Sequence, residues 1–554
     1  MYPLLLTLAL VLPFELTQPL FFVGPVGITS VELPLYALLA LSLTRRDVWR
    51  PSSWTPVHWA AIVWAAAHLA SAAAAEGDRS LPLRFALRMC AGAALVFPVG
   101  ASTPPTGRAE GVLLALVAGG VFSAALGLLE TLAPGGAGLL SPFKTVTARV
   151  GEALRAGGPF QYPNPAALFW GATLPALLVV GAPTSPGAGR HRRLITAACA
   201  LVLLAAAAAT GSRGGLVAAA VALAVLAAAG GSNLRRPALL AFGGLAAAVL
   251  IAGRANPTLM MRGPAFGDPP WFAGRFEAVG SPPEITAGQR ARLRTRVRNV
   301  GALGWETAGP MPMGVAVQWR EATGGLAHEE PPTPLARAVA PGGTALVDAE
   351  VTAPARPGLY RLRWQLVGGN TAFENPDTPS EEIPITVVGP PVSAGPTTLL
   401  PRRVQRQATR PELWRAGGRM WRERPLLGVG PDNFRRLYGP YLGPRTLDDR
   451  VNANSLYVET LANLGLVGAA SLVLLFAALA HGAFREWRNE RGPERMMVIA
   501  SGAALLAIAL HGIVDSVLPA TPLYGLFWIH AGLLAGLSRE GGRGGHPTRR
   551  FWAG

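Results

Sequence analysis

Residues 454–481 read NSLYVETLANLGLVGAASLVLLFAALAH, and Glu459 is the only charged residue among them. A helix of this length can cross the roughly 30 Å hydrocarbon core of a bilayer. Similar apolar runs recur through the 554-residue chain, which is 50% hydrophobic and only 15% charged. The pattern predicts an all-α polytopic membrane protein of about twelve transmembrane helices.

The predicted spans are about 3–20, 29–44, 55–75, 83–101, 110–132, 164–183, 194–210, 214–230, 237–253, 454–481, 496–514 and 519–538. The segment 1–13 has no basic residues and no small-residue cleavage site follows it, so we expect a retained helix rather than a signal peptide. Cys90 and Cys199 both lie in apolar runs, without disulfide or metal-ligand spacing.

The formal charge of +17 raises the question of nucleic-acid binding, but much of this charge lies in short loops between apolar runs. Loops rich in arginine face the cytoplasm in membrane proteins. We therefore expect a bacterial inner-membrane protein with both termini cytoplasmic and no nucleic-acid partner. The predicted parts are a bundle of about nine helices (1–253), an extracytoplasmic insert (254–400), a helical interfacial loop (401–453), about three further helices (454–540) and a basic cytoplasmic tail (541–554).

The insert at 254–400 has the pattern of β-structure. In Arg292–Val300 apolar and arginine side chains alternate, and Val315–Trp319, Leu346–Val351, Leu359–Val367 and Ile383–Val388 are further candidate strands. Turn signals rich in proline and glycine separate them. The spacing predicts a periplasmic, all-β, immunoglobulin-like sandwich. A structural spacer that binds no ligand is an equally open interpretation of this domain.

Arg213 is the first candidate for chemistry. It lies in Thr210-Gly-Ser-Arg-Gly-Gly215, a very short turn between two alanine-rich spans. An arginine at membrane depth usually faces protein or a wet cavity, and its planar guanidinium suits phosphate. The alternative is an arginine that extends to the lipid headgroups.

Residues 410–434 combine a basic helix with a glycine turn. The stretch 411–423 is predicted to be an interfacial helix, in which Leu413, Met420 and Trp421 could form the apolar stripe. A simple surface anchor is the alternative. Gly428 and Gly430 predict a tight turn before Asp432.

Polar residues mark two further positions at predicted span ends. Asn452 and Asn454 precede span 454–481, where a plain helix cap is the alternative. His511 and Asp515 are spaced to share one helix face. An ionisable pair in a span is a functional candidate by default, although a pair that only holds helices together is the alternative.

Together these stretches resemble the O-antigen ligases and related polymerases. The resemblance rests on Arg410…Trp414…Pro425-Leu-Leu-Gly-Val-Gly430…Asn433-Phe434…Asn454-Ser-Leu-Tyr457…Gly465-Leu-Val-Gly468, on Gly158-Pro-Phe-Gln-Tyr-Pro-Asn164, and on Thr210–Gly214. It implies a membrane glycosyltransferase that moves a glycan from an undecaprenyl-diphosphate carrier to a lipid, glycan or protein acceptor, in cell-surface polysaccharide biosynthesis. It implies no metal or other cofactor.

The resemblance also assigns roles to residues. Arg213 and Arg410 would hold the diphosphate leaving group, where fixed guanidinium groups stabilise developing charge. Substrate binding would also involve a set of polar residues: Asn164, Asn452, Tyr457, His511 and Asp515.

One position departs from the family pattern. The family usually has a histidine, thought to act as the base, where this chain has Asn454. An amide does not accept a proton usefully near neutral pH. Either Glu459, Asp448 or Asp449 replaces it, or Asn454 only orients the acceptor, or the activity is lost. Two other functions stay open: a transporter or flippase of lipid-linked sugars, and an inactive scaffold that works through its immunoglobulin-like domain.

Overall fold

The structure is a computed structural model of the chain. It describes residues 1–24, 26–103, 106–133, 135–145, 147–150, 153–182, 189–260, 271–279, 284–308, 312–323, 325–368, 371–373, 382–392, 403–404, 408–442 and 451–541. Contacts divide the chain into two units, one formed by Met1–Leu259 with Arg410–Gly554 and the other by Met260–Thr409.

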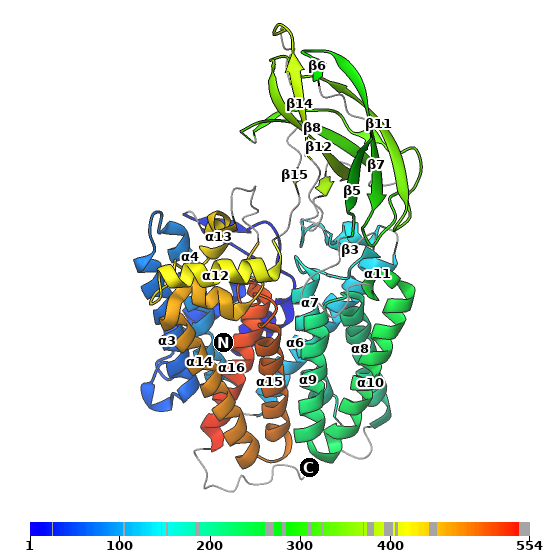
Figure 1. The fold of residues 1–554 in the computed structure, drawn as a ribbon. Coiled ribbons are helices and arrows are strands. Elements are labelled where there is room, and N and C mark those ends of the chain that lie inside the picture. Colours follow the sequence, from blue (N-terminus) through cyan, green and yellow to red (C-terminus); the bar gives the residue numbers. More distant parts are fainter. Residues whose placement is uncertain are drawn as a thin grey trace, which may run out of the picture. The chain divides into compact units, whose positions relative to one another are not determined.

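The first unit is a bundle in which long helices run alongside one another (Figure 1). Its helices are α1 (Tyr2–Val11), α2 (Glu32–Leu43), α3 (Pro56–Ala74), α4 (Ser80–Ala94), α5 (Val96–Ser102), α6 (Thr106–Leu132), α7 (Pro163–Val180), α8 (Gly189–Ala209), α9 (Arg213–Ala229), α10 (Gly231–Ala255), α12 (Arg410–Glu423), α13 (Phe434–Leu442), α14 (Leu456–Asn489), α15 (Gly492–His511) and α16 (Thr521–Gly541). The short α11 (Pro257–Met260) ends at the unit boundary. Small elements fill the connections: β1 (Phe21–Val23), β2 (Val26–Ile28), β3 (Arg149–Val150), β4 (Ala153–Leu154) and the 3-10 turns Pro51–Ser53 and Gly136–Leu140.

Eight helical segments of the described chain are long and apolar enough to cross a membrane. They are Pro56–Ala74, Ser80–Ser102, Thr106–Leu132, Pro163–Val180, Gly189–Ala209, Gly231–Ala255, Leu456–Asn489 and Gly492–His511. Three more helices are apolar but shorter: Tyr2–Val11, Glu32–Leu43 and Arg213–Ala229. The helical membrane architecture is confirmed, and the count of twelve spans stays a prediction.

The first predicted span, 3–20, is wrong in its second half. Helix α1 ends at Val11, and a β1–β2 hairpin follows, with Phe21 opposite Ile28. Pro13 and Pro19 lie in the intervening segment. Proline has no N–H to donate and its ring obstructs the preceding turn, so the helix does not continue to residue 20.

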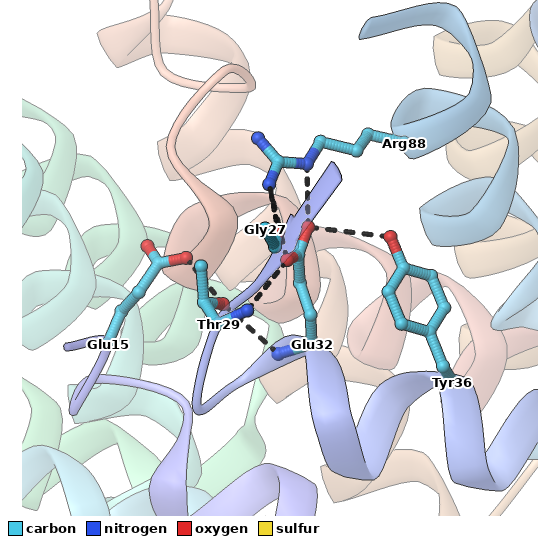
Figure 2. Close-up of polar contacts among 6 residues, drawn as sticks. All are labelled: Glu15, Gly27, Thr29, Glu32, Tyr36 and Arg88. Atoms are coloured by element: carbon cyan, nitrogen blue, oxygen red, sulfur yellow. Dashed lines mark hydrogen bonds and ion pairs between the residues drawn. The ribbon is translucent and has the colours of Figure 1, made fainter. Parts of the chain in front are cut away.

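A buried carboxylate holds the connection between α1 and α2 against α4 (Figure 2). The Glu32 side chain accepts hydrogen bonds from the Thr29 N–H (3.0 Å) and the Tyr36 hydroxyl (3.4 Å). Arg88 forms an ion pair with it, Nε to Oε1 at 2.7 Å. The Thr29 hydroxyl also donates to Glu15. These bonds satisfy Glu32, which is only 3% exposed, and fix the start of α2.

The second unit is a two-sheet β-sandwich. One sheet has the order β11–β7–β5, and the other has the order β10–β8–β12–β13–β15, with β14, β6 and β9 attached to it. The two sheets share one apolar core, in which Trp305, Trp319 and Trp364 are fully buried. The strands are β5 (Gly274–Val279), β6 (Glu284–Thr286), β7 (Arg290–Asn299), β8 (Met313–Glu321), β9 (Leu326–Glu329), β10 (Thr333–Pro334), β11 (Thr344–Thr352), β12 (Gly358–Gly368), β13 (Thr371–Phe373), β14 (Glu382–Val388) and β15 (Arg403–Val404).

All five strands predicted from alternation are confirmed within a few residues, as β7, β8, β11, β12 and β14. In β7 the side chains of Leu293, Thr295 and Val297 are buried and the intervening arginines are exposed. Successive side chains of a strand point to opposite faces of the sheet, so a strand with one covered face has alternating buried and exposed residues. The assignment to the immunoglobulin-like class stays a prediction.

Candidate functional site

The turn between α8 and α9 presents Arg213 at the first position of α9. Gly211 adopts a positive φ of 58°, which glycine allows at no steric cost. The Ser212 hydroxyl then accepts a hydrogen bond from the Gly215 N–H (3.4 Å) and caps the helix. The chain therefore reverses within three residues and places the guanidinium-bearing residue at a helix N-terminus, where backbone N–H groups favour anions.

Arg155 joins this turn to the start of α7. Its Nε donates to the Thr210 carbonyl at 2.6 Å, and its Nη2 donates to Asn164 Oδ1 at 3.0 Å. Arg155 is only 9% exposed. Two of the predicted motifs, Gly158–Asn164 and Thr210–Gly214, are therefore held together by a third arginine that the sequence pattern did not indicate.

Asp515 continues the network from Asn164. Its carboxylate accepts a hydrogen bond from the Ser516 N–H at 2.8 Å and lies beside the side chains of Asn164 and His511. His511 Nε2 and Asp515 Oδ2 lie 3.5 Å apart. Burial alone would raise the pKa of Asp515, but the neighbouring His511 and Asn164 side chains and the Ser516 N–H outweigh burial and hold the pKa below its ordinary value. The two side chains lie close together as predicted, but α15 ends at His511 and Asp515 follows the helix rather than sharing its face. Their functional role stays a prediction.

The segment before α14 is a second compact turn. Asn454 adopts a positive φ of 48°, and its N–H donates to Asn452 Oδ1 at 2.9 Å. Ser455, rather than either asparagine, caps α14, because its hydroxyl accepts from the Val458 N–H (3.4 Å). The Leu456 N–H then donates to the carbonyls of Gly512 and Asp515. The interpretation of Asn452 or Asn454 as a plain helix cap is therefore wrong.

Two other predicted residues lie on the first turn of α14. The Tyr457 hydroxyl donates to the Ala509 carbonyl at 2.7 Å, and its side chain is 38% exposed. Glu459 points inward and is buried. Its Oε2 accepts from the Ala453 N–H (3.3 Å) and from the Ser516 hydroxyl. Ser516 thus connects the Asp515 end of the network to Glu459.

A small cavity of about 40 Å³ opens beside Glu459. Its lining includes Ser516, Thr460, Trp64 and His68. A space of this size with several polar groups can hold water. Among the described residues that line this cavity, Glu459 is the one carboxylate.

Helix α12 lies crosswise at one end of the bundle, over α14 (Figure 1). Arg410 is its first residue, and Trp414 Nε1 donates to the Ala453 carbonyl at 3.0 Å. The buried face of α12 consists of Leu413, Ala416, Gly417 and Met420. A side chain at Gly417 would approach Val458 to 2.6 Å. The prediction of an interfacial helix therefore needs a correction: the face of α12 that carries Leu413 and Met420 is buried within the bundle, where α12 contacts α14 and α13.

The glycine turn at 425–430 fits into a break in α14. Gly465, inside α14, has φ 65° and ψ −158°, so the helix is interrupted there. The freed backbone groups bond to the turn: Leu466 N–H to the Pro425 carbonyl (2.8 Å) and Val429 N–H to the Ala462 carbonyl (3.0 Å). Gly428 has a positive φ of 66°, as a tight turn predicts, and an added Cβ would lie 2.4 Å from the Asn463 backbone. Only glycine permits this approach.

The structure thus brings most of the predicted site residues into one neighbourhood. Arg213's turn, Asn164, His511, Asp515 and the stretch 452–459 are linked by hydrogen bonds or direct packing, and α12 carries Arg410 to the same region through Trp414. Asp448 and Asp449, the other candidate bases, lie outside the described residues. Arg155 and Ser516 are the additions that the sequence pattern missed.

Comparison with known proteins assigns this region to a family. Residues 402–473, which contain α12, α13 and the first half of α14, match the family O-Antigen ligase. The match supports a membrane glycosyltransferase-like role in polysaccharide biosynthesis, with a lipid-linked glycan and an acceptor as partners. No curated protein matches the chain.

Two solved structures show weak similarity. One is a CARDB domain from Pyrococcus furiosus in complex with di-metal ions, with 20% identity, covering 21% of this chain and 90% of that chain at a TM-score of 0.16. The other is an alkylpurine DNA glycosylase from Pseudomonas fluorescens bound to DNA containing an abasic site analog, with 13% identity, 57% and 83% coverage and a TM-score of 0.15. At such TM-scores neither likeness bears on fold or function.

Proposed function

We propose that this protein transfers a glycan from an undecaprenyl-diphosphate carrier to an acceptor hydroxyl at the extracytoplasmic face of the inner membrane. The single observation that carries the proposal is that hydrogen bonds and direct packing bring together Asn164, the Arg213 turn, Asp515 and Glu459, the last of which lies within the O-antigen ligase segment. Groups from four separate stretches of chain meet there, as a site for a large two-part substrate requires.

The leaving group is the carrier diphosphate, and two arginines have the chemistry to hold it. Arg213 begins α9 and Arg410 begins α12, so each residue lies at a helix N-terminus, where the helix dipole favours an anion. Negative charge grows on the bridging phosphate oxygen as its bond to the sugar breaks. Fixed cations that meet this charge lower the barrier more than they strengthen ground-state binding.

Arg155 is a positioning residue for the proposed site. Its two hydrogen bonds join Thr210 to Asn164 and so set the distance between the Arg213 turn and the first turn of α7. A planar guanidinium can bond in two directions at once, whereas a lysine ammonium on a flexible stem does not fix two partners in one plane.

Glu459 takes the proton in place of the family's histidine. In the transfer step the acceptor oxygen forms a bond to the anomeric carbon of the donor sugar, and the bonding pair of the broken C–O bond leaves with undecaprenyl diphosphate. The acceptor hydroxyl proton passes to Glu459, through Ser516 or a water in the adjoining cavity. Asn454 orients the acceptor, since its amide can donate and accept hydrogen bonds but cannot take up the proton.

The experiment is transfer in vitro, with purified protein and a defined undecaprenyl-diphosphate glycan. Release of undecaprenyl diphosphate together with a lengthened or glycosylated acceptor supports the proposal. Movement of the intact lipid-linked glycan across a liposome membrane without release would assign the protein to the transporters instead. Neither release nor movement with several glycans would favour a non-catalytic scaffold.

A further inference from the structure

Five arginines form a straight row on the exposed face of β7. They are Arg290, Arg292, Arg294, Arg296 and Arg298, and each is exposed, while the residues between them face the core. Alternate residues of a strand are about 6.6–6.8 Å apart along its axis. The row therefore presents a guanidinium at a regular interval over the whole length of the strand.

The neighbouring strands neutralise only part of this charge. In β11, Asp348 lies opposite Arg294 and Glu350 opposite Arg292; in β5, Arg275 lies opposite Arg298 and Glu277 opposite Arg296. Arg294 forms an ion pair with Asp348 at 2.6 Å, and Arg296 pairs with Glu277 at 3.6 Å. The exposed positions of these three strands hold six arginines and three acidic residues, so the face keeps an excess of positive charge.

The chemistry of this face restricts its partner. Its other exposed residues on these strands are Thr344 and Leu346, and none of its described outward residues is aromatic. Surfaces that bind single-stranded nucleic acid interleave aromatic rings with basic residues, and surfaces that insert into a membrane carry several exposed apolar or aromatic side chains. The face therefore lacks the features of both kinds of surface. It is an array of guanidinium groups, which bind carboxylate or phosphate through paired hydrogen bonds.

We propose that the arginine face of β5, β7 and β11 binds an acidic polysaccharide, a linear glycan that carries carboxylate or phosphate groups at intervals along its length. A regular row of cations favours an extended polymer over a compact anion, because successive charges can be met together. That the polymer is a glycan rests on the proposed function, whereas the binding of a linear polyanion rests on the arginine row itself. This face would hold the acceptor or product chain near the enzyme and raise its local concentration.

The test uses the full-length protein in detergent and three fluorescent polymers: polygalacturonate (carboxylate), inorganic polyphosphate (phosphate) and dextran (neutral). Anionic lipid vesicles and a DNA oligonucleotide are measured beside them. The triple variant Arg290→Ser, Arg292→Ser, Arg298→Ser removes cations from the face but leaves both ion pairs in place. Its control is Arg337→Ser, Arg356→Ser, Arg361→Ser, which removes the same number of exposed arginines elsewhere in the β unit and also breaks the Arg361–Glu382 ion pair, so the control perturbs the unit at least as much as the face variant does. Thermal unfolding confirms that both variants fold.

We expect polygalacturonate, polyphosphate or both to bind, with dextran inert. The face variant should weaken binding by about tenfold or more, the control by less than about threefold, and raising the salt should weaken the wild type progressively. The tighter of the two polyanions identifies the charged group.

Equal losses in both variants, no polyanion binding, or tighter binding to anionic lipid vesicles or a DNA oligonucleotide would overturn the proposal. Release of undecaprenyl diphosphate, assayed on the same preparations, separates the two proposals: binding without release refutes glycan transfer alone, and release without binding refutes the arginine face alone.

Discussion

Gly214 lies directly against His511. A methyl group at Gly214 would be 3.2 Å from His511 Nδ1 and 2.6 Å from Cγ2 of Val514. The turn that carries Arg213 is therefore packed on the segment that carries Asp515, and the distance between them depends on the absence of one side chain.

Gly214→Ala should destabilise the protein by about 1–3 kcal/mol, because the added methyl group overpacks a close contact, and it should lower the transfer rate by displacing Arg213. Equilibrium unfolding in detergent and the release assay measure the two effects. Gly243→Ala in α10 is the control, since a methyl group there meets nothing within 4 Å and alanine favours the helix. Equal stability and equal release by the Gly214→Ala and Gly243→Ala variants would contradict the close packing of Gly214 on His511.

Arg410→Ala should lower the turnover by about 10²–10³-fold, because a fixed charge on the departing diphosphate acts mainly in the transition state. Arg422→Ala is the matched control, as it lies on the exposed side of the same basic helix. Steady-state kinetics separates the effects: a change in KM alone for Arg410→Ala would mean that the arginine binds substrate without stabilising the leaving group.

Glu459→Gln should lower turnover by about 10²-fold or more, the usual contribution of a general base. Asn454→His should restore part of that loss in the Glu459→Gln background, since histidine tolerates the positive φ of this position better than most residues. Asn454→Ala serves as the control for the substitution itself. If Asn454→His gives no gain in either background, the imidazole does not reach the acceptor and this assignment of roles fails.

Glu130 and Lys144 form a buried ion pair that holds the loop before α7. Glu130 also accepts hydrogen bonds from the N–H groups of Gly157 and Gly158, both at 2.9 Å. Glu130→Gln should therefore cost about 3–5 kcal/mol, because it leaves a buried ammonium without its partner. Glu110→Gln, in the same helix but in a half-exposed pair with Arg192, should cost less than about 1 kcal/mol. Similar losses in both would contradict the burial of the first pair.

Asp515 should make stability depend on pH in the acid range. Its pKa in the folded protein lies below the ordinary value of 3.8, so its contribution is fully present above that pH and is lost as the pH falls through the folded pKa. The difference in unfolding free energy between wild type and Asp515→Asn should stay constant near neutral pH and shrink on acidification. A difference in unfolding free energy that grows on acidification would contradict a lowered pKa for Asp515.

The sequence predicted the elements better than their contacts. Long apolar runs specify helices and strict alternation specifies strands, so α14 and β7 were identified from local pattern alone. The early end of α1 follows from Pro13, which lies inside the predicted span 3–20. The contact of Arg155 with Asn164 and the packing of α12 on α14 depend on tertiary structure. Nothing near Arg155 distinguishes it from a surface arginine, because its partners lie on other elements.

The most direct measurement is the release of undecaprenyl diphosphate from a lipid-linked glycan by the wild type and by Arg213→Ala, side by side. We expect release by the wild type and a loss of about 10²-fold or more in the variant, with both proteins unfolding at similar temperatures. Release at the same rate by both proteins would contradict the placement of Arg213 at the leaving group, and no release by either would contradict glycan transfer itself.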